Sequence, residues 1–149
     1  MRAVVTRVSE ASVVIGGRTV GQIGCGFLIL LGIAPDDTRK EATRLAEKVL
    51  GLRVFKDPDD KMNLGLESVG GQVLVVSQFT LYGNVRKGRR PSFVGAAGPE
   101  TAIPLYEFFL AECARLGYPP QHGEFGADMK VSSVNDGPVT ILVDTADLA

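Results

Sequence analysis

Three polar side chains stand together at the end of the most hydrophobic predicted strand. Ser77, Gln78 and Thr80 follow the apolar run Val73–Val76 within four residues, and a polar cluster that closes an apolar strand is a common position for ligand contacts. A Ser or Thr hydroxyl in such a place can act as a nucleophile if a base lies within hydrogen-bond reach. An ordinary strand end, with its hydroxyls bonded to the backbone, is the alternative interpretation.

The sequence offers no convincing base for such a nucleophile. The single histidine, His122, lies in a loop-like stretch behind Pro119 and Pro120, and no Ser-His-Asp arrangement can be argued. A hydrolase with this sequence is therefore expected to work without a dedicated general base. No glycine-rich phosphate loop of a common type is present, and neither cysteine has a Cys or His at metal-ligand spacing. We therefore expect no metal and no cofactor.

A second candidate segment, Asn135-Asp136-Gly137-Pro138, lies between the apolar runs Met129–Val134 and Val139–Val143. Pro138 has a fixed φ and no N–H to donate, and it pushes Gly137 away from the α region. An X-Pro bond is also the one place where a cis peptide costs little. A rigid Gly-Pro corner can present backbone carbonyls at a fixed angle, although a tight hairpin turn is the simplest interpretation.

A purely cationic loop follows the first segment, with no Asp or Glu between Phe79 and Pro99. Four basic residues fall within five positions of this loop: Arg86, Lys87, Arg89 and Arg90. The formal net charge of the whole chain is −1, so this local concentration favours a polyanionic partner. Tyr82 and Phe93 flank the basic residues and are placed to stack on bases. A solvated surface loop is the alternative.

Two helices and several strands are predicted to position these segments. Thr38 and Glu41 have the spacing of a capping box, so a helix is expected to begin there and to end at Gly51. A second helix is expected over Pro99–Gly117, and a hairpin turn at Gly70-Gly71. The predicted strands are Arg2–Ile15, Arg18–Ile23, Phe27–Gly32, Leu52–Phe55, Gln72–Ser77, His122–Phe125, Met129–Val134 and Val139–Asp144.

Hairpins dominate this order of elements, so the predicted fold class is α+β, with a mainly antiparallel sheet curled into a β-barrel-like core with two helices. The composition, 45% hydrophobic and 22% charged, and the lack of repeats or linkers predict one domain over residues 1–149. Cys25 and Cys113 are expected to be buried thiols in a reducing compartment. No signal peptide or membrane-spanning run is found, so we expect a cytoplasmic location and no membrane partner.

Taken together, the two candidate segments resemble the signature segments of a known family, the D-aminoacyl-tRNA deacylases. Ser77-Gln78-Phe79-Thr80-Leu81 and Asn135-Asp136-Gly137-Pro138-Val139-Thr140 match those signatures without departure. Further similarity extends over nearly the whole chain, at Arg7-Val8, Lys61–Leu64, Arg90–Phe93 and Ala127–Met129. Each motif alone would be weak evidence for the family. The two segments together, at this separation and in a chain of this length, are specific for it.

The resemblance implies an obligate homodimer whose active sites form at the interface. The Ser77–Thr80 segment of one subunit would face Gly137-Pro138 of the other, and the Gly-Pro bond of the family is cis. The implied activity is hydrolysis of D-aminoacyl-tRNA, and of glycine mischarged on tRNA-Ala. An L side chain would clash with the rigid corner, whereas a D side chain would project outward, so selectivity arises by rejection.

The resemblance also gives roles to the candidate residues. The backbone N–H groups of Phe79 and Thr80 would contact the carbonyl or oxyanion, and Ser77 and Gln78 would position the substrate. A free ribose hydroxyl of the tRNA would assist hydrolysis, which would explain the missing base. A nucleophilic Thr80 hydroxyl is the alternative mechanism.

The remaining expectations concern the tRNA and the support of the corner. Phe125 and Met129 are expected to hold the terminal adenosine, and the cationic loop is expected to contact the tRNA. Arg7 either braces the Gly-Pro corner or is an ordinary strand-end arginine. A small-ester hydrolase and an RNA-binding module without catalysis are the alternative functions.

Overall fold

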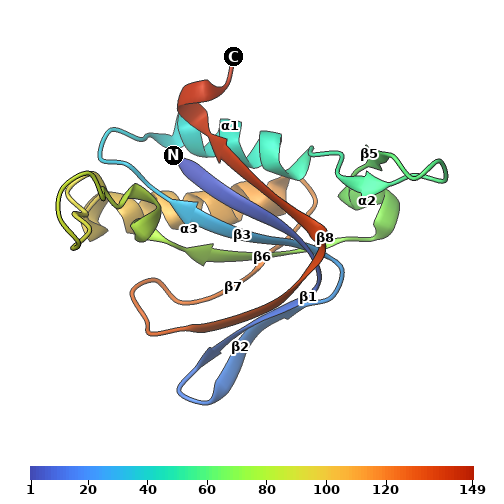
Figure 1. Ribbon diagram of the computed structural model, residues 1–149, viewed down its shortest axis with the longest axis horizontal. Coiled ribbons are helices and arrows are strands. Elements are labelled where there is room, and N and C mark those ends of the chain that lie inside the picture. Colours follow the sequence, from blue (N-terminus) through green and yellow to red (C-terminus); the bar gives the residue numbers. More distant parts are fainter.

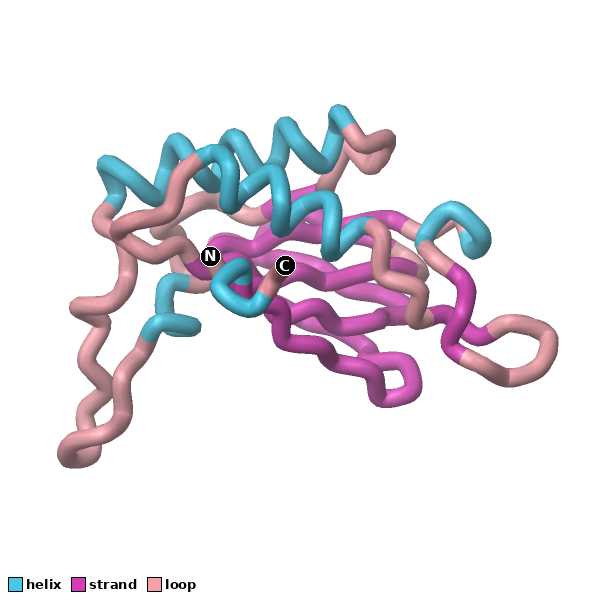
Figure 2. Tube along the Cα trace, turned by 90° about the horizontal axis from the view of Figure 1, so that it is seen from above, coloured by secondary structure: helices cyan, strands magenta, loops and turns pink.

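The computed structural model describes residues 1–149 as a curled β-sheet with two long helices packed across one of its faces (Figure 1). Helix α1 spans Arg39–Leu50 and helix α3 spans Pro99–Arg115, and they lie side by side over the sheet (Figure 2). The predicted capping box is confirmed at α1, where the Thr38 hydroxyl accepts from the Lys40 N–H and the Glu41 carboxylate accepts from the Thr38 N–H. None of the helices has the length and apolar character needed to span a membrane.

The sheet is built around the long first strand. Its order is β2-β1-β3-β6-β7, and β8 pairs with the opposite edge of β1. The strand bounds are β1 Arg2–Ile15, β2 Arg18–Ile23, β3 Gly26–Gly32, β6 Gln72–Ser77, β7 Gln121–His122 and β8 Lys130–Asp144. The predicted α+β, barrel-like architecture is confirmed, but the sheet is mixed, because β6 runs parallel to both β3 and β7.

The crossover from β3 to β6 explains one wrong prediction. Beyond α1 the chain forms a small hairpin of β4 (Phe55–Lys56) and β5 (Met62–Leu64), followed by a third, short helix, α2 (Leu66–Val69). Gly70 ends α2 in the left-handed region, with φ 62°, where glycine carries no side-chain penalty. Gly70-Gly71 therefore leads from a helix into a parallel strand and is not a hairpin turn.

The second wrong prediction concerns the Gly-Pro corner, which is not a hairpin either. Strand β8 is continuous through it, and Asn135 and Thr140 both pair with β1, opposite Val8 and Thr6. The residues from Asp136 to Val139 have no partners and bulge out of the ladder opposite the single residue Arg7. A bulge re-aims the chain locally while the strand continues on both sides, so the corner projects from a fixed base.

The curl of the sheet creates two apolar cores. One lies between the sheet and the helices and includes Val5 of β1; the other lies inside the curl and includes Val13 of the same strand. Side chains along a regular strand alternate between faces, so these two odd-numbered residues would share a face without an irregularity. The register with β8 shifts twice between Thr6 and Glu10, at the point where β1 changes sides.

An arginine clamp fixes the turn that follows β6. This turn is a 3₁₀ helix, η1 (Phe79–Tyr82). Arg2 donates to the Asp144 carboxylate (Nε to Oδ2, 2.6 Å) and to the Leu81 carbonyl (3.1 Å), and its guanidinium lies 4.4 Å from the centroid of the Tyr82 ring. Gly32 allows the turn to pack closely, because a Cβ there would lie 3.0 Å from Leu81 Cβ.

The Arg2–Asp144 ion pair makes part of the free energy of unfolding sensitive to acid. Burial tends to raise the pKa of Asp144, but the hydrogen bonds from Arg2 and the Ala146 N–H and the charge of Arg2 hold that pKa below its ordinary value. The pair therefore stabilises the fold above the unfolded pKa of about 3.9, and this stabilisation is lost as the pH falls through the folded pKa. At neutral pH Asp144→Asn should lower the free energy of unfolding by roughly 1 kcal/mol, a value discounted for the exposure of Arg2.

Urea denaturation at pH 7 and pH 3 measures this effect. The difference between wild type and Asp144→Asn should be present at pH 7 and should shrink at pH 3, whereas the exposed Asp59→Asn should match wild type at both values. A deficit of Asp144→Asn that is equal at the two pH values would contradict the ion-pair explanation.

Candidate active site

The Ser77–Thr80 segment forms where β6 ends and turns away from the sheet. Ser77 still pairs with Leu31 of β3, and the Gln78 N–H donates to the Leu31 carbonyl (2.7 Å). The first hydrogen bond of η1 then runs from the Leu81 N–H to the Gln78 carbonyl (3.2 Å). The N–H groups of Phe79 and Thr80 have no acceptor within the turn, as expected at the start of a helix, so they remain available to a ligand oxygen.

The hydroxyls of this segment have no acid–base partner. The Thr80 hydroxyl accepts a hydrogen bond from the Gln78 amide, and no carboxylate or histidine bonds to it. Nδ1 of His122, on β7, lies 2.7 Å from the Gly123 carbonyl oxygen, and His122 does not line the adjoining pocket. The local geometry therefore lacks the paired base that an activated hydroxyl requires.

A pocket of about 320 Å³ adjoins the end of β6. It brings together five of the predicted site residues: Ser77, Gln78, Phe79, Phe125 and Met129. Apolar residues of the sheet and of α3 complete its wall, among them Val76, Leu31 and Ala102. A largely apolar cavity with a few polar groups at one end is the usual form of a small-molecule site. Thr80 is exposed and lies outside this wall.

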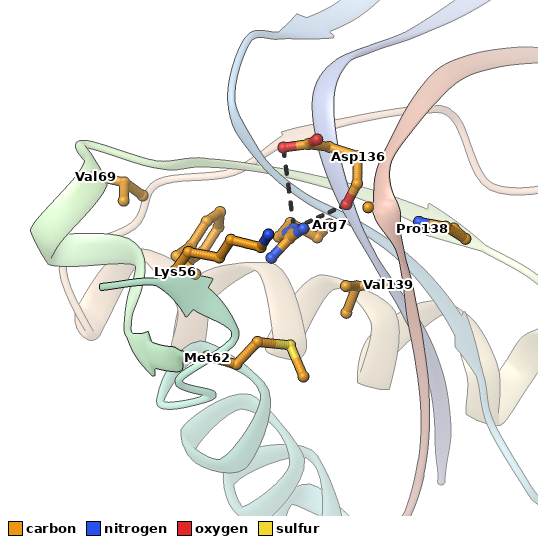
Figure 3. Close-up of a pocket in the computed structure, with 9 residues that line it drawn as sticks. Arg7, Lys56, Met62, Val69, Asp136, Pro138 and Val139 are labelled. Carbon is orange, nitrogen blue, oxygen red and sulfur yellow. Dashed lines mark hydrogen bonds and ion pairs between the residues drawn. The ribbon is translucent and has the colours of Figure 1, made fainter. Parts of the chain in front are cut away.

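The Gly-Pro corner is held by a buried arginine. Arg7 is 5% exposed and donates to the Asp136 carbonyl (Nε, 2.8 Å) and to the Val54 carbonyl (Nη1, 2.6 Å). The Gly137-Pro138 peptide bond is cis, and Pro138 is exposed and points away from Arg7 (Figure 3). Arg7 is thus a brace of the corner rather than an ordinary strand-end arginine.

Two further features hold the base of the corner. The Asn135 side chain accepts from the Val139 N–H (2.9 Å) and donates to the Thr140 hydroxyl (2.9 Å), which closes the bulge from within. At Gly137, with φ 134°, a Cβ would lie 2.7 Å from Arg7 Nη2, so only glycine fits against the guanidinium. Sequence reasoning gave Asn135 no role of its own, because its partners become apparent only once the bulge is known.

The corner and the Ser77–Thr80 segment do not share a cavity within one chain. The corner borders a separate pocket, whose other lining residues include Phe55, Lys56, Met62 and Val69 (Figure 3), and none of these lines the pocket beside β6. The two signature segments therefore border different cavities of the protomer.

The cationic loop projects from the body beside η1 (Figure 1). Asn84 and Ser92 pair through two backbone hydrogen bonds of 2.7 and 2.9 Å and close its base. Its four basic residues, Arg86, Lys87, Arg89 and Arg90, are all exposed. None of them forms an ion pair within the chain, so their charge is free to meet an external anion.

The cysteines take no part in the candidate site. Cys113 is buried as predicted, and burial together with nearby Glu112 raises the pKa of its thiol to about 12, so the reactive thiolate is not populated near neutral pH. Cys25 is exposed, contrary to the prediction, because it lies in the bend between β2 and β3 rather than in the apolar run that follows. No group of His, Cys, Asp and Glu side chains has the geometry to hold a metal ion.

Similar proteins share both the sequence and the fold. D-aminoacyl-tRNA deacylase from Desulfatibacillum aliphaticivorans is 59% identical over 145 residues, which cover 97% of this chain and 99% of that protein. The protein of the same name from Thermus aquaticus is 55% identical over 147 residues, 99% of this chain and 97% of the relative.

Two solved structures are also similar. A structure titled c-Myc DNA Unwinding Element Binding Protein is 42% identical, with a TM-score of 0.91, and the match covers 97% of this chain and 98% of that chain. A probable eukaryotic D-amino acid tRNA deacylase shares the fold at 17% identity, with a TM-score of 0.80 over 95% of this chain and 97% of that chain.

The match to a protein family extends over almost the entire fold. The sequence profile described as D-Tyr-tRNA(Tyr) deacylase aligns with residues 4–144, from β1 to the end of β8, and so includes both signature segments. With this match and the full-length relatives, the chain belongs to the D-Tyr-tRNA(Tyr) deacylase family.

Proposed function

We propose that this protein hydrolyses the ester bond of D-aminoacyl-tRNA, and of glycine mischarged on tRNA-Ala, and rejects L-aminoacyl-tRNA. The observation that carries the proposal is the pair of signature segments: a pocket beside unbonded N–H groups, with no base bonded to the neighbouring hydroxyls, and a corner braced by a buried arginine. The names of relatives at 55–59% identity support D-aminoacyl-tRNA as the substrate.

The active unit is a homodimer in which the corner of one subunit enters the pocket of the other. Apolar side chains that lack a partner on β8 support this assembly: Val131, Val134 and Leu142 are 39%, 49% and 67% exposed. Leu142 lies opposite Val4, which lies opposite Leu30, so an apolar row crosses three strands. Exposed apolar rows of this kind favour association, and β8 also carries the corner.

The corner acts as the chiral gate. Its carbonyls cannot swing away, because Arg7 holds the Asp136 carbonyl and Asn135 closes the bulge. An L side chain would point at this fixed wall and clash, a D side chain would point outward, and glycine would pass because it has no side chain. Such a gate only rejects, so it does not depend on the identity of the D side chain.

The chemistry rests on positioning and on the substrate. The N–H groups of Phe79 and Thr80 stabilise the oxyanion that forms when the ester carbonyl is attacked, and Ser77 and Gln78 orient the ester. The free ribose hydroxyl beside the ester assists the attack of water. The bond that the Thr80 hydroxyl accepts from Gln78, and the lack of a base beside it, favour this route over a nucleophilic Thr80.

The tRNA is held at two places. Phe125 and Met129 line the pocket beside Ser77 and receive the terminal adenosine. The cationic loop neutralises phosphates of the acceptor strand, because its basic residues are exposed and unpaired.

The gate predicts the effect of Pro138→Ala on stereoselectivity. Removal of the pyrrolidine ring loosens the wall that excludes L side chains, so the preference for D-tyrosyl-tRNA over L-tyrosyl-tRNA, measured as the ratio of kcat/KM values, should fall about tenfold or more. Pro58→Ala, in an exposed turn far along the chain, is the matched control and should leave the ratio unchanged. Full activity of Pro138→Ala with an unchanged ratio would refute the gate.

The substrate-assisted mechanism predicts opposite outcomes for two deletions of a hydroxyl. Thr80→Val should keep turnover within about threefold of wild type, because only a positioning contact is lost. A D-aminoacyl ester on the 3′ oxygen of a 2′-deoxy terminal adenosine should be hydrolysed about 100-fold more slowly, the typical scale of general acid–base assistance. Single-turnover rates distinguish the two mechanisms. Loss of activity in Thr80→Val, with normal hydrolysis of the deoxy substrate, would show that the Thr80 hydroxyl is the nucleophile.

A further inference from the structure

Two exposed phenylalanine rings form an aromatic surface beside the pocket. Phe79 is 55% exposed and Phe93 is 38% exposed, and their ring centroids lie 5.1 Å apart at an interplanar angle of 73°. Large aromatic side chains usually bury most of their area, so two of them paired at the surface point to a ligand. We refer to Phe79 and Phe93 together as the aromatic ledge.

The ledge is held firmly by the base of the cationic loop. Phe93 directly follows the Asn84–Ser92 bridge, which fixes the chain at that point. Its ring lies against the backbone of Gly83, where a Cβ would come within 3.1 Å of the ring. The edge-to-face contact with Phe79 fixes the orientation of both rings. The ledge is therefore formed before any ligand arrives.

The chain segment that forms the ledge carries only positive charge, and Asp128 is the one acid that lines the adjoining pocket. Between Phe79 and Pro99 there is no Asp or Glu, and the four basic residues of the loop are exposed and unpaired. Aromatic faces next to unpaired cations are the combination that binds single-stranded nucleic acid, because bases stack while phosphates are neutralised. An interface with a second copy of this slightly acidic chain would not need such a concentration of one charge.

We infer that the aromatic ledge stacks the base of the unpaired nucleotide that precedes the terminal adenosine of the tRNA. This inference rests on the proposed function. Phe79 lines the pocket assigned to the terminal adenosine, and Phe93 contacts Phe79 from outside the wall of that pocket. A nucleotide that adjoins the terminal adenosine is therefore within reach of the ledge. Stacking on a π-face tolerates any base, which suits an enzyme that acts on many tRNAs.

A ladder of substrates isolates this contact. The experiment compares three proteins, wild type, Phe93→Ala and Phe93→Trp. Each is given the D-tyrosyl esters of adenosine, of the dinucleotide cytidylyl-adenosine and of full-length tRNA, and kcat/KM for hydrolysis is measured. With adenosine alone Phe93→Ala should equal wild type, whereas with the dinucleotide and the tRNA its kcat/KM should fall about tenfold or more. Phe93→Trp, which keeps an aromatic face, should retain wild-type values on all three. The deficit should persist in high salt, because stacking is not screened as phosphate contacts are.

A dinucleotide that lacks the base of its first nucleotide completes the test. The ledge predicts that wild type and Phe93→Ala hydrolyse this substrate equally. Equal activity of the two proteins on every substrate, or a deficit of Phe93→Ala on adenosine alone, would overturn the inference, as would a change from dimer to monomer in Phe93→Ala by sedimentation. Failure of wild type to hydrolyse any of the esters would overturn the proposed function instead. Binding of uncharged RNA, with and without the penultimate base, then still tests the ledge.

Discussion

The hydrogen bonds of Arg7 to two backbone carbonyls are the interaction on which the architecture of the site depends. A buried guanidinium must have its donors satisfied, and the Asp136 and Val54 carbonyls satisfy two of them at 2.8 and 2.6 Å. These bonds tie the bulge of β8 to the chain beyond α1. They account for glycine at position 137, where a Cβ would clash with the guanidinium. They also hold the bulge, which projects from the sheet, in one position. The Asp136 carboxylate, 4.0 Å from Arg7 Nε, adds little beside the carbonyl bond.

Strand β8 connects this brace to the rest of the fold. Its end is joined through Asp144 and Arg2 to η1, the turn that presents the N–H groups of Phe79 and Thr80. One pair of antiparallel strands, β1 and β8, thus supports both signature segments, although the two segments border different cavities of the protomer. A rigid support with two separated functional surfaces is what a composite site between identical subunits requires.

Much of this organisation follows from local sequence. The Thr38–Glu41 capping box, the strands β1, β2 and β6 and the polar end of β6 are short-range patterns, and the structure has them where predicted. The short strands β4 and β7 are displaced from the predicted Leu52–Phe55 and His122–Phe125. The two wrong predictions of hairpins concern segments whose conformation is set by pairing between strands that are distant in the sequence. Gly70-Gly71 has the composition of a hairpin, but the parallel pairing of β6 with β3 overrides it. The Gly-Pro segment has the composition of a turn, but β1 continues past it and keeps β8 in one piece. Likewise, the contacts that Arg2 and Asn135 make cannot be predicted from local sequence patterns, because they depend on the folded positions of their partners.

The central claim, that the corner of one subunit completes the pocket of the other, is tested most directly in a heterodimer purified through two different tags. One subunit carries Pro138→Ala and an intact pocket; the other carries Met129→Trp, which fills its pocket, and an intact corner. All hydrolysis then comes from the pocket of the Pro138→Ala subunit. If the corner acts across the interface, the preference for D- over L-tyrosyl-tRNA returns to the wild-type value, although the Pro138→Ala homodimer has lost it. A heterodimer as unselective as that homodimer, or chains that remain monomeric, would contradict the account.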